Sequence, residues 1–432
     1  MSAARRRVAI TGIGLVTPVG LDVASTWDAV IAGRGGIRPI ESFDAGGFPV
    51  RIAGEVRGLA EDRLPLPRRV AKLAGRYHRF ALAAAAEALA DAAIVPSTSD
   101  PERWGCVVGS GMLGVAYDDL ADFQRRHAPA GELVTGGLLS EGAASADPVA
   151  FCRSHALGGL ALLLRAFGIR GPSSSVHTAC ASGGQALGTA LRLVRSGRAD
   201  RALAGGFDSM VTPVGLAGFC LLGALSTDND EPDRASRPFD RTRNGFVLGE
   251  GAGFLVLEEW ERACARGARI HAELAGDGSS LSSYRITDSH PSGDGPIQAM
   301  RAALRDAGVA AAEVGYVNAH GTSTPMNDRS ECAAIRAVFG PPPDGPWVSS
   351  TKALLGHAIA AAGAIEAAIT ALALHHGVLP ANANLSERDP DCDVRLVLGE
   401  SRREPVRVAL SNSFGFGGSN SSLVLRAVEN AA

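Results

Sequence analysis

The sequence predicts an α/β protein, and three observations support this fold class. Short apolar runs typical of buried strands alternate with Ala-rich stretches typical of helices along the whole chain. The 432 residues are 46% hydrophobic, which is enough for a large core. The order of strand, small-residue turn and helix recurs in the second part, so we predict two pseudo-repeats, residues 1–260 and 261–432.

The individual elements follow from apolar runs and from their flanking turn residues. In the first repeat, strands are expected at 7–14, 104–111, 201–207 and 254–260, and helices at 76–93 and 183–197. In the second repeat, strands running into Gly/Ser turns are expected within 314–325, 347–357 and 406–420, and helices within 296–309 and 358–377. The polar segments 225–245 and 276–296 are expected to be loops, long enough to serve as lids.

Composition and charge exclude several classes of protein. The net charge is −3 and 20% of the residues are charged, so a general polyanion binder, and with it a nucleic-acid partner, is not expected. The N-terminal Arg cluster precedes an apolar run that Gly12 and Gly14 interrupt, which predicts a strand and a turn rather than a signal peptide. No uninterrupted run of about 18 apolar residues occurs, so no membrane span is expected.

Cysteine and lysine usage is also informative. The seven cysteines are scattered and have no CxxC spacing, which disfavours a disulfide framework and a zinc site and indicates a reducing cytoplasm. Only two of the 42 basic residues, Lys72 and Lys352, are lysines. Because an ammonium is a compact point charge and a guanidinium is a planar fork, a lysine can mark a position that arginine cannot serve. Chance retention is the alternative.

The segment SSVHTACASGGQALGTALRLVRSG places Cys180 between small residues and a helix start. Free backbone N–H groups and the helix dipole at such a position favour a thiolate, and hence a nucleophile. A small apolar filler is the alternative, because buried cysteines are common in cores. His177 lies three residues before Cys180, but the strand running into the turn is expected to point it elsewhere.

Two histidines and one glycine turn lie at the ends of predicted strands, where α/β proteins place catalytic groups. His320 ends the strand of VNAHGTSTP, and His357 follows Lys352 by five residues in STKALLGHAIAAAGAIEAA. Each histidine alone is equally typical of a structural role. In SNSFGFGGSN, Gly415, Gly417 and Gly418 form a turn whose N–H groups could face a developing oxyanion. This turn lacks the GxxxxGK[ST] pattern of a phosphate-binding P-loop. The N-terminal segment TGIGLVT lacks the third glycine of a dinucleotide-binding fingerprint.

Four motifs in this order resemble the β-ketoacyl-[acyl carrier protein] synthases, the elongating condensing enzymes of the thiolase superfamily. They are TACASG, NAHGTSTP, STKxxxGHxxxAAGxxE and NSFGFGGSN. The resemblance runs from VAITGIGLVTPVG to the C-terminal strand. It implies a five-layer α-β-α-β-α body made of two βαβαβαββ halves, the second carrying the catalytic histidines. The related chain-length factors lack the nucleophile, so the resemblance implies a catalytic subunit.

The resemblance also implies roles for residues. Cys180 would hold the acyl chain as a thioester, and a malonyl-type extender would lose CO2. His320 and His357 would stabilise the enolate, and the N–H groups of Cys180 and Phe416 would hold the oxyanion. Lys352 would organise the second histidine, supported by the buried acids Glu331 and Glu366. Other implied roles concern the phosphopantetheine arm (Thr322 and Thr324) and the acyl pocket or its gate (Met112, Phe219 and Phe416).

The implied partner is an acyl carrier protein, whose phosphopantetheine carries the substrates, and no tightly bound cofactor is expected. Carrier proteins are acidic, and basic residues at steps of three and four predict a docking face on one helix. These residues are Arg68, Arg69, Lys72, Arg76 and Arg79. A merely solvated helix face is the alternative. A homodimer is expected, and a heterodimer with a chain-length-factor homologue is the other possibility.

Several alternatives remain open. Segments 145–164 and 279–291 depart from the usual elongation-synthase pattern, which leaves chain length and the choice between fatty-acid and polyketide synthesis undecided. A thiolase would use a second cysteine as base, and a non-condensing acyltransferase could share the fold. A papain-like hydrolase would leave the second histidine, Lys352 and the glycine turn unexplained. A non-catalytic scaffold subunit would need neither Cys180 nor the two histidines.

Overall fold

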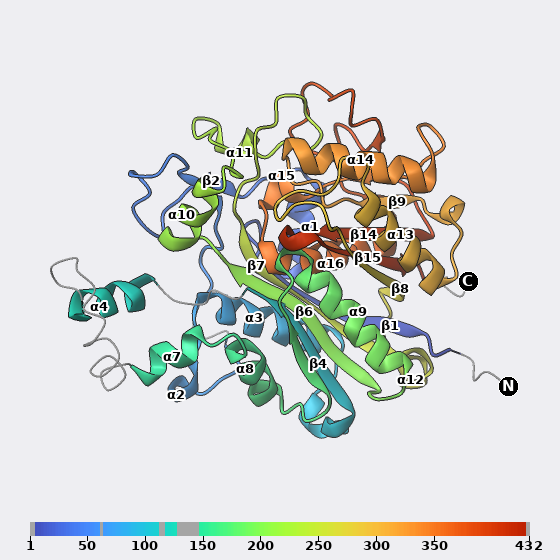
Figure 1. The fold of residues 1–432 in the computed structure, drawn as a ribbon. Coiled ribbons are helices and arrows are strands. Elements are labelled where there is room, and N and C mark those ends of the chain that lie inside the picture. The colour runs from blue at the N-terminus through green and yellow to red at the C-terminus, as the bar shows by residue number, and fades with distance from the viewer. Residues whose placement is uncertain (1–4, 61–63, 112–116, 128–146, 429–432) are drawn as a thin grey trace.

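The same order of elements occurs twice along the chain (Figure 1). The computed structural model describes residues 5–60, 64–111, 117–127 and 147–428. The first series is β1 (Val8–Val16), α3 (Arg76–Asp91), β4 (Trp104–Ser110), α8 (Gly158–Phe167), β5 (Ser173–Val176), α9 (Ser182–Arg195), β6 (Arg201–Ser209) and β7 (Glu250–Glu259). The second series is β8 (Ala272–Leu281), α13 (Asp294–Ala307), β9 (Tyr316–Asn318), α14 (Pro325–Phe339), β10 (Trp347–Ser349), α16 (Ala362–His376), β14 (Val408–Phe414) and β15 (Ser419–Arg426). Each series reads βαβαβαββ.

Shorter elements connect these series. They are α1 (Val23–Ile31), β2 (Ile37–Pro39), β3 (Ile52–Gly54), α2 (Arg68–Ala71), α4 (Tyr117–His127), α7 (Pro148–Ser154), α10 (Pro213–Leu221), α11 (Pro232–Ala235), α12 (Trp260–Ala265), α15 (Lys352–Leu355), β11 (Val378–Leu379), β12 (Arg395–Leu396) and β13 (Arg402–Arg403). Two single 3-10 turns, η4 (Ala179–Ala181) and η6 (Ile359–Ala361), directly precede α9 and α16.

Strand pairing is also repeated. The eleven-stranded sheet has the order β12-β10-β9-β14-β15-β8-β1-β7-β6-β4-β5. In the first series β7 lies antiparallel between β1 and β6, and β6, β4 and β5 run parallel. In the second series β15 lies antiparallel between β8 and β14, and β14, β9 and β10 run parallel. The two parts join through a short antiparallel contact of β1 with β8. The boundary at residue 260 stays a prediction.

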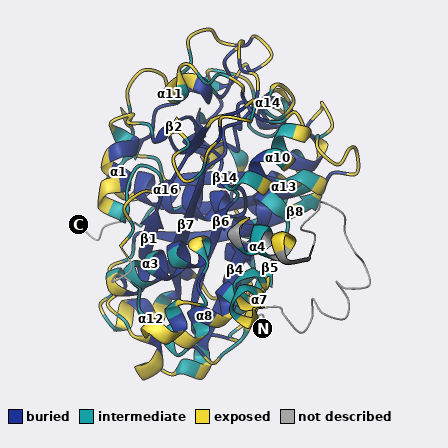
Figure 2. Cartoon of the chain, turned by 90° about the vertical axis from the view of Figure 1, so that its left-hand side faces the viewer, coloured by how far each residue is buried: buried dark blue, intermediate teal, exposed yellow. Residues whose placement is uncertain are grey.

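Helices form three layers around the strands, and the expected five-layer body is confirmed. Helix α3 packs on β1, β7 and β6, and α13 packs on β8 and β15. Helices α9 and α16 lie between the two parts, since each contacts strands of both series and also the other helix. Buried residues fill this interior, and exposed residues gather on the outer helices and loops (Figure 2). The central layer therefore brings the starts of α9 and α16 together.

Close approach of the two central helices depends on glycine in their first turns. A Cβ on Gly183 would lie 2.8 Å from the backbone nitrogen of Ala364, and one on Gly363 would lie 2.7 Å from that of Gly184. Such contacts are far inside van der Waals distance, so a larger residue would separate the helices.

One long apolar helical stretch belongs to this central layer. Ile359–His376 is long and apolar enough to cross a membrane, but 89% of it is buried inside the protein. The bent pair α7 and α8 passes the same length and composition test only when its two helices are counted together. The Ala-rich sequence of α16 is explained by its burial on all sides between two layers of strands.

The two segments expected to be lids differ from that expectation. The loop predicted at 276–296 is shorter, because β8 extends to Leu281 and α13 begins at Asp294. Segment 225–245 is anchored rather than free: its buried Arg243 forms ion pairs with Asp328 and Asp389. That anchoring fixes the segment against the turn that follows β9.

Candidate active site

Cys180 lies in a sharp turn between β5 and α9, as the sequence predicts. The turn forces Ala179 to a positive φ of 49°, and Cys180 is 4% exposed. Ser182 stabilises the turn: its hydroxyl accepts a hydrogen bond from the N–H of Thr178 at 2.8 Å and donates to the carbonyl of Ala179 at 2.6 Å. Small residues permit this compact strand-turn-helix connection, which we call the first elbow (residues 178–182).

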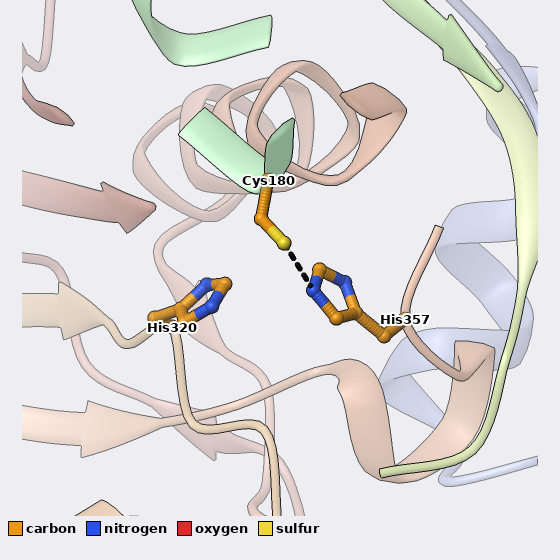
Figure 3. A group of neighbouring side chains, drawn as sticks. All are labelled: Cys180, His320 and His357. Atoms are coloured by element: carbon orange, nitrogen blue, oxygen red, sulfur yellow. Dashed lines mark hydrogen bonds between the residues drawn. The ribbon is translucent and has the colours of Figure 1, made fainter. Parts of the chain in front are cut away.

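The two distant histidines meet at this thiol (Figure 3). The Nε2 atom of His357 lies 3.0 Å from Sγ of Cys180, and the ring centroids of His320 and His357 are 5.2 Å apart. His357 precedes η6, and His320 follows β9. All three side chains are buried. His177 instead contacts the carbonyl oxygen of Ser110 through Nδ1, at 2.9 Å.

Two buried side chains fix the backbone around His320. Glu331 on α14 accepts the N–H groups of His320 and Gly321, each at 2.8 Å. The Nζ of Lys352 donates to the carbonyl oxygen of His320 at 2.7 Å and forms an ion pair with Glu366. The expectation that Lys352 organises the second histidine is therefore corrected: its hydrogen bond is to the first.

Burial keeps the histidines neutral. Desolvation first, and then the positive charge of Lys352, lowers the pKa of His320 and of His357 well below the ordinary value. Neither Nδ1 has a hydrogen-bond partner among the described residues. Both rings are therefore neutral imidazoles at pH 7, as the sequence analysis expects for groups that stabilise negative charge.

Burial also raises the pKa of the Cys180 thiol, to about 12, despite the opposing charge of Lys352 and hydrogen bonds from the N–H groups of Phe416 and Cys180. The expected preference for the thiolate is therefore wrong, because desolvation outweighs the helix start. The sulfur needs a proton acceptor when it reacts. The neutral His357 lies at hydrogen-bond distance from it, 3.0 Å from Sγ to Nε2.

The glycine turn closes over the first elbow. A Cβ on Gly415 would lie 3.0 Å from the backbone nitrogen of Cys180, so only glycine allows the turn to approach this closely. The N–H groups of Phe416 and Cys180 lower the pKa of the sulfur, so both can stabilise negative charge at this position.

A cavity of about 60 Å³ joins these groups to the surface. This volume is large enough for only a few water molecules, so an acyl chain enters only if the lining moves. Thr322 and Thr324 line it, with their hydroxyls 2.9 Å apart. Phe416 also lines it, and Phe219 on α10 contacts Phe416 with ring centroids 6.4 Å apart. Met112 lies outside the described residues.

The charge around this cavity determines whether an anion or a cation is favoured there. Cys180, His320 and His357 form the one group among the described residues that is close enough to share a metal ion. Lys352 places a positive charge beside them and lowers the pKa of both histidines. The field therefore favours a developing anion over a cation at this position.

The basic docking face is not on one helix. α2 ends at Ala71, and α3 begins at Arg76 with Gly75 as its N-cap. Arg68, Arg69, Lys72 and Arg76 are all exposed, and Arg76 also binds the buried Glu250 and the carbonyl of Val56. The single helix expected for the five basic residues is therefore wrong, and the docking face stays a prediction.

Sequence reasoning missed several residues around the site. Phe246 packs edge-to-face on His357, with centroids 5.3 Å apart. Asp208, at the end of β6, accepts the N–H of Ala360 at 3.1 Å. An acid directly after the apolar run ALAGGF was the available signal for Asp208. For Phe246 no local signal exists, because an aromatic residue after a polar loop is equally typical of core packing.

Comparisons with known proteins agree with this geometry. The family models for the beta-ketoacyl synthase N-terminal and C-terminal domains match residues 5–263 and 271–386. The 3-oxoacyl-[acyl-carrier-protein] synthase 2 of Synechocystis sp. is 40% identical over 98% of both chains. Two solved structures are similar: the ishigamide ketosynthase/chain length factor (TM-score 0.87, 36% identity, 99% of this chain and 100% of that chain), and a type II PKS acyl-carrier protein in complex with its ketosynthase bound to the hexaketide (TM-score 0.84, 34% identity, 98% and 100%).

These matches span nearly the whole chain, and they agree with a thiolase-like fold in which a buried cysteine faces two neutral histidines. The chain therefore belongs to the beta-ketoacyl synthase family of acyltransferases.

Proposed function

We propose that the site catalyses decarboxylative Claisen condensation of an acyl chain on Cys180 with malonyl carried by an acyl carrier protein. In the first step Sγ attacks the acyl thioester, and the thiol proton passes to His357. The new Sγ–acyl bond forms as the carrier's C–S bond breaks, and the carrier thiol leaves with that proton. The distance of 3.0 Å between Sγ and Nε2 of His357 carries this proposal.

In the second step malonyl loses CO2, and the electron pair of the broken C–C bond forms an enolate. His320 and His357 donate hydrogen bonds to the enolate oxygen, where neutral imidazoles avoid the repulsion that a carboxylate would cause. The enolate carbon attacks the acyl thioester, and the oxyanion is held by the N–H groups of Cys180 and Phe416. The C–Sγ bond then breaks, the 3-oxoacyl carrier leaves and the thiolate takes a proton from solvent.

The surrounding residues have supporting roles. Lys352, paired with Glu366, holds the backbone of His320 and contributes positive charge. Glu331 fixes the same turn from the opposite side. Thr322 and Thr324 bind the phosphopantetheine arm, since their hydroxyls line the cavity above the histidines. Phe416 and Phe219 gate the acyl pocket. No tightly bound cofactor takes part in this scheme.

The acyl carrier protein is the proposed partner. The solved relative that contains an acyl-carrier protein with its ketosynthase supports this. Arg68, Arg69 and Lys72 are the proposed docking residues, because they are exposed and an acidic carrier would be attracted to them. A cytoplasmic location is consistent with seven free cysteines.

A second protein subunit is also proposed. β5 lies at the edge of the sheet, and its Ser173 and Ser174 are exposed. An edge strand offers unpaired backbone groups to a matching strand, so a second copy pairing there would form a homodimer. The ishigamide relative is a ketosynthase/chain length factor, which makes a heterodimeric ketosynthase subunit the second candidate. The mass of the purified assembly, alone and with such a homologue, distinguishes the two.

Mass spectrometry of the protein after incubation with acyl-carrier and malonyl-carrier tests the reaction. The parent protein is expected to gain one acyl group on Cys180 and to release 3-oxoacyl-carrier. Cys180→Ala is expected to lose both the adduct and the product. A Cys180→Ala protein that keeps both would contradict the proposal. Cys180→Gln should still release CO2 from malonyl-carrier without condensation, and loss of CO2 release as well would contradict the division of roles between cysteine and histidines.

A further inference from the structure

The turn that precedes α16 repeats the geometry of the first elbow. Ile359 has a positive φ of 46°, against 49° for Ala179, and each residue begins a 3-10 turn that leads directly into a central helix. We call residues 358–362 the second elbow. A β-branched residue with positive φ is a strained conformation that the surroundings must maintain. His357, the proton acceptor of Cys180, lies two residues before Ile359.

The two elbows are stabilised differently. The first contains its own hydrogen-bonding side chain, Ser182, whereas the corresponding position in the second is Ala362. The second elbow is instead bound by Asp208 of the first series. Oδ2 of Asp208 accepts the N–H of Ala360 at 3.1 Å, and Oδ1 accepts the N–H of Ser209 at 2.8 Å.

Asp208 is unusual because it is buried without a cation. It is 4% exposed, and no ion pair reaches it within the described ranges of the chain. The backbone of Gly111 closes the space above it, since a Cβ there would lie 2.7 Å from Oδ1. Burying an unpaired carboxylate is costly unless hydrogen bonds compensate for it. The two backbone N–H groups are that compensation, and one of them belongs to the second elbow.

Other contacts restrain the opposite side of His357. Its N–H donates to the carbonyl of Val247 at 2.7 Å, and its carbonyl accepts the N–H of Gly249 at 2.9 Å. The position of the ring relative to Cys180 therefore depends on the two backbone hydrogen bonds and the packing of Phe246 before the elbow, and on the hydrogen bond from Asp208 within it. Removing the second restraint frees the strained residue Ile359 to relax.

We propose that Asp208 is a positioning residue that holds the second elbow, and through it His357, at reacting distance from Cys180. The inference rests on the roles proposed above for Cys180 and His357. Asp208 contacts the second elbow through the backbone N–H of Ala360, and its charge also raises the pKa of the Cys180 thiol.

The test compares Asp208→Ala and Asp208→Asn with the parent in the full-length protein, using acyl-carrier and malonyl-carrier as substrates. For Asp208→Ala, kcat is expected to fall about 10- to 100-fold, as for a misplacement of about 1 Å. KM for the carriers should stay within about twofold, because the docking surface is unchanged. Asp208→Asn keeps the volume and one acceptor oxygen, so a smaller fall in kcat is expected.

Asp200→Asn is the matched control. Asp200 is also buried and adjoins β6, but it lies at the opposite end and binds Arg103 and Arg262. This variant should lose stability while kcat stays unchanged. A folded Asp208→Ala protein with parental kcat would overturn the proposal. If Asp208→Ala does not fold, parental kcat in Asp208→Asn overturns it, and failure of both to fold would assign Asp208 to folding alone and also overturn it.

The outcome is separable from that of the proposed function. If Cys180→Ala keeps its acyl adduct, the proposed function fails whatever the Asp208 variants do. If Cys180→Ala loses the adduct and the Asp208 variants match the parent, only the positioning role fails.

Discussion

The first and second elbows share a backbone shape but use it for different purposes. In both, a residue with positive φ begins a 3-10 turn that leads into a central helix. In the first, the N–H of Cys180 faces the sulfur, whereas in the second the corresponding N–H, of Ala360, is bound by Asp208. The backbone N–H of Cys180 can therefore act on the reacting sulfur, whereas the N–H of Ala360 can only help to position a neighbouring residue. The hydrogen-bond partner of this N–H group distinguishes the two elbows.

The largest expected difference between the elbows is in catalysis. Cys180→Ala should abolish acylation at the site, because Cys180 is the one cysteine among the described residues that line the cavity. His357→Ala should retain a slowly formed adduct while condensation falls about 10²- to 10⁴-fold, the range expected for loss of a proton-transferring group. Single-turnover mass spectrometry separates the two effects. A His357→Ala protein with parental condensation rate would show that the residue preceding the second elbow is not a reacting group.

The second prediction concerns the pH dependence of stability, because a carboxyl group, Asp208, stabilises the second elbow and a hydroxyl group, Ser182, stabilises the first. Burial raises the pKa of Asp208 to about 7, from an ordinary value of 3.8, so the folded state disfavours its charged form. The contribution of Asp208 to stability is therefore greatest below pH 4 and is lost as pH rises towards 7. Asp208→Asn removes this dependence.

Urea unfolding of the parent and of Asp208→Asn between pH 4 and pH 8 measures this pH dependence of the free energy of unfolding. The free energy of unfolding of the parent should fall, relative to that of the variant, by a few kcal/mol, roughly 1.4 kcal/mol for each pH unit between the two pKa values. Ser182→Ala alters only an uncharged group and should leave the pH dependence as in the parent. Parallel pH curves for parent and Asp208→Asn would contradict the assignment of a titrating acid at the second elbow.

A third prediction concerns the glycines where the two helices cross. Gly183→Ala places a Cβ 2.9 Å from the carbonyl oxygen of Ala360, so the second elbow must move away from the first. We expect a loss of about 1–3 kcal/mol in the free energy of unfolding, typical of overpacking, together with a fall in kcat. Gly47→Ala is the control, because no atom lies within 4 Å of a Cβ there. Equal effects of the two substitutions would argue against tight packing at the crossing.

The smallest expected effect comes from exchanging the hydroxyl between the elbows. Ser182→Ala should destabilise the protein by about 1 kcal/mol, the net value of a hydrogen bond. Ala362→Ser introduces the corresponding hydroxyl in the second elbow and should restore part of the kcat lost in Asp208→Ala. Steady-state kinetics of the double variant checks this. No recovery, in a folded double variant, would show that the two elbows are not interchangeable in their stabilisation.

Much of the site was predictable because its motifs are local. Each strand end followed by small residues, such as NAHGTSTP or TACASG, predicts a turn at which a polar side chain can emerge, and all four motifs contribute to one cavity. The single helix predicted for the basic residues is wrong because α2 ends at Ala71 and a second helix, α3, begins after Gly75. The thiol pKa was misjudged because a helix start is visible in sequence and the depth of burial is not.

By itself, the sequence determined the α/β class, the order of elements and the three side chains that meet in the candidate site, because apolar periodicity, turn residues and nucleophile types are local properties of the chain. Tertiary structure alone decided that Lys352 binds the backbone of His320, that burial outweighs the helix dipole at Cys180, and that Asp208 reaches Ala360. The physical reason is that desolvation and long-range hydrogen bonds depend on which layers pack together, and 152 residues separate Asp208 from its partner.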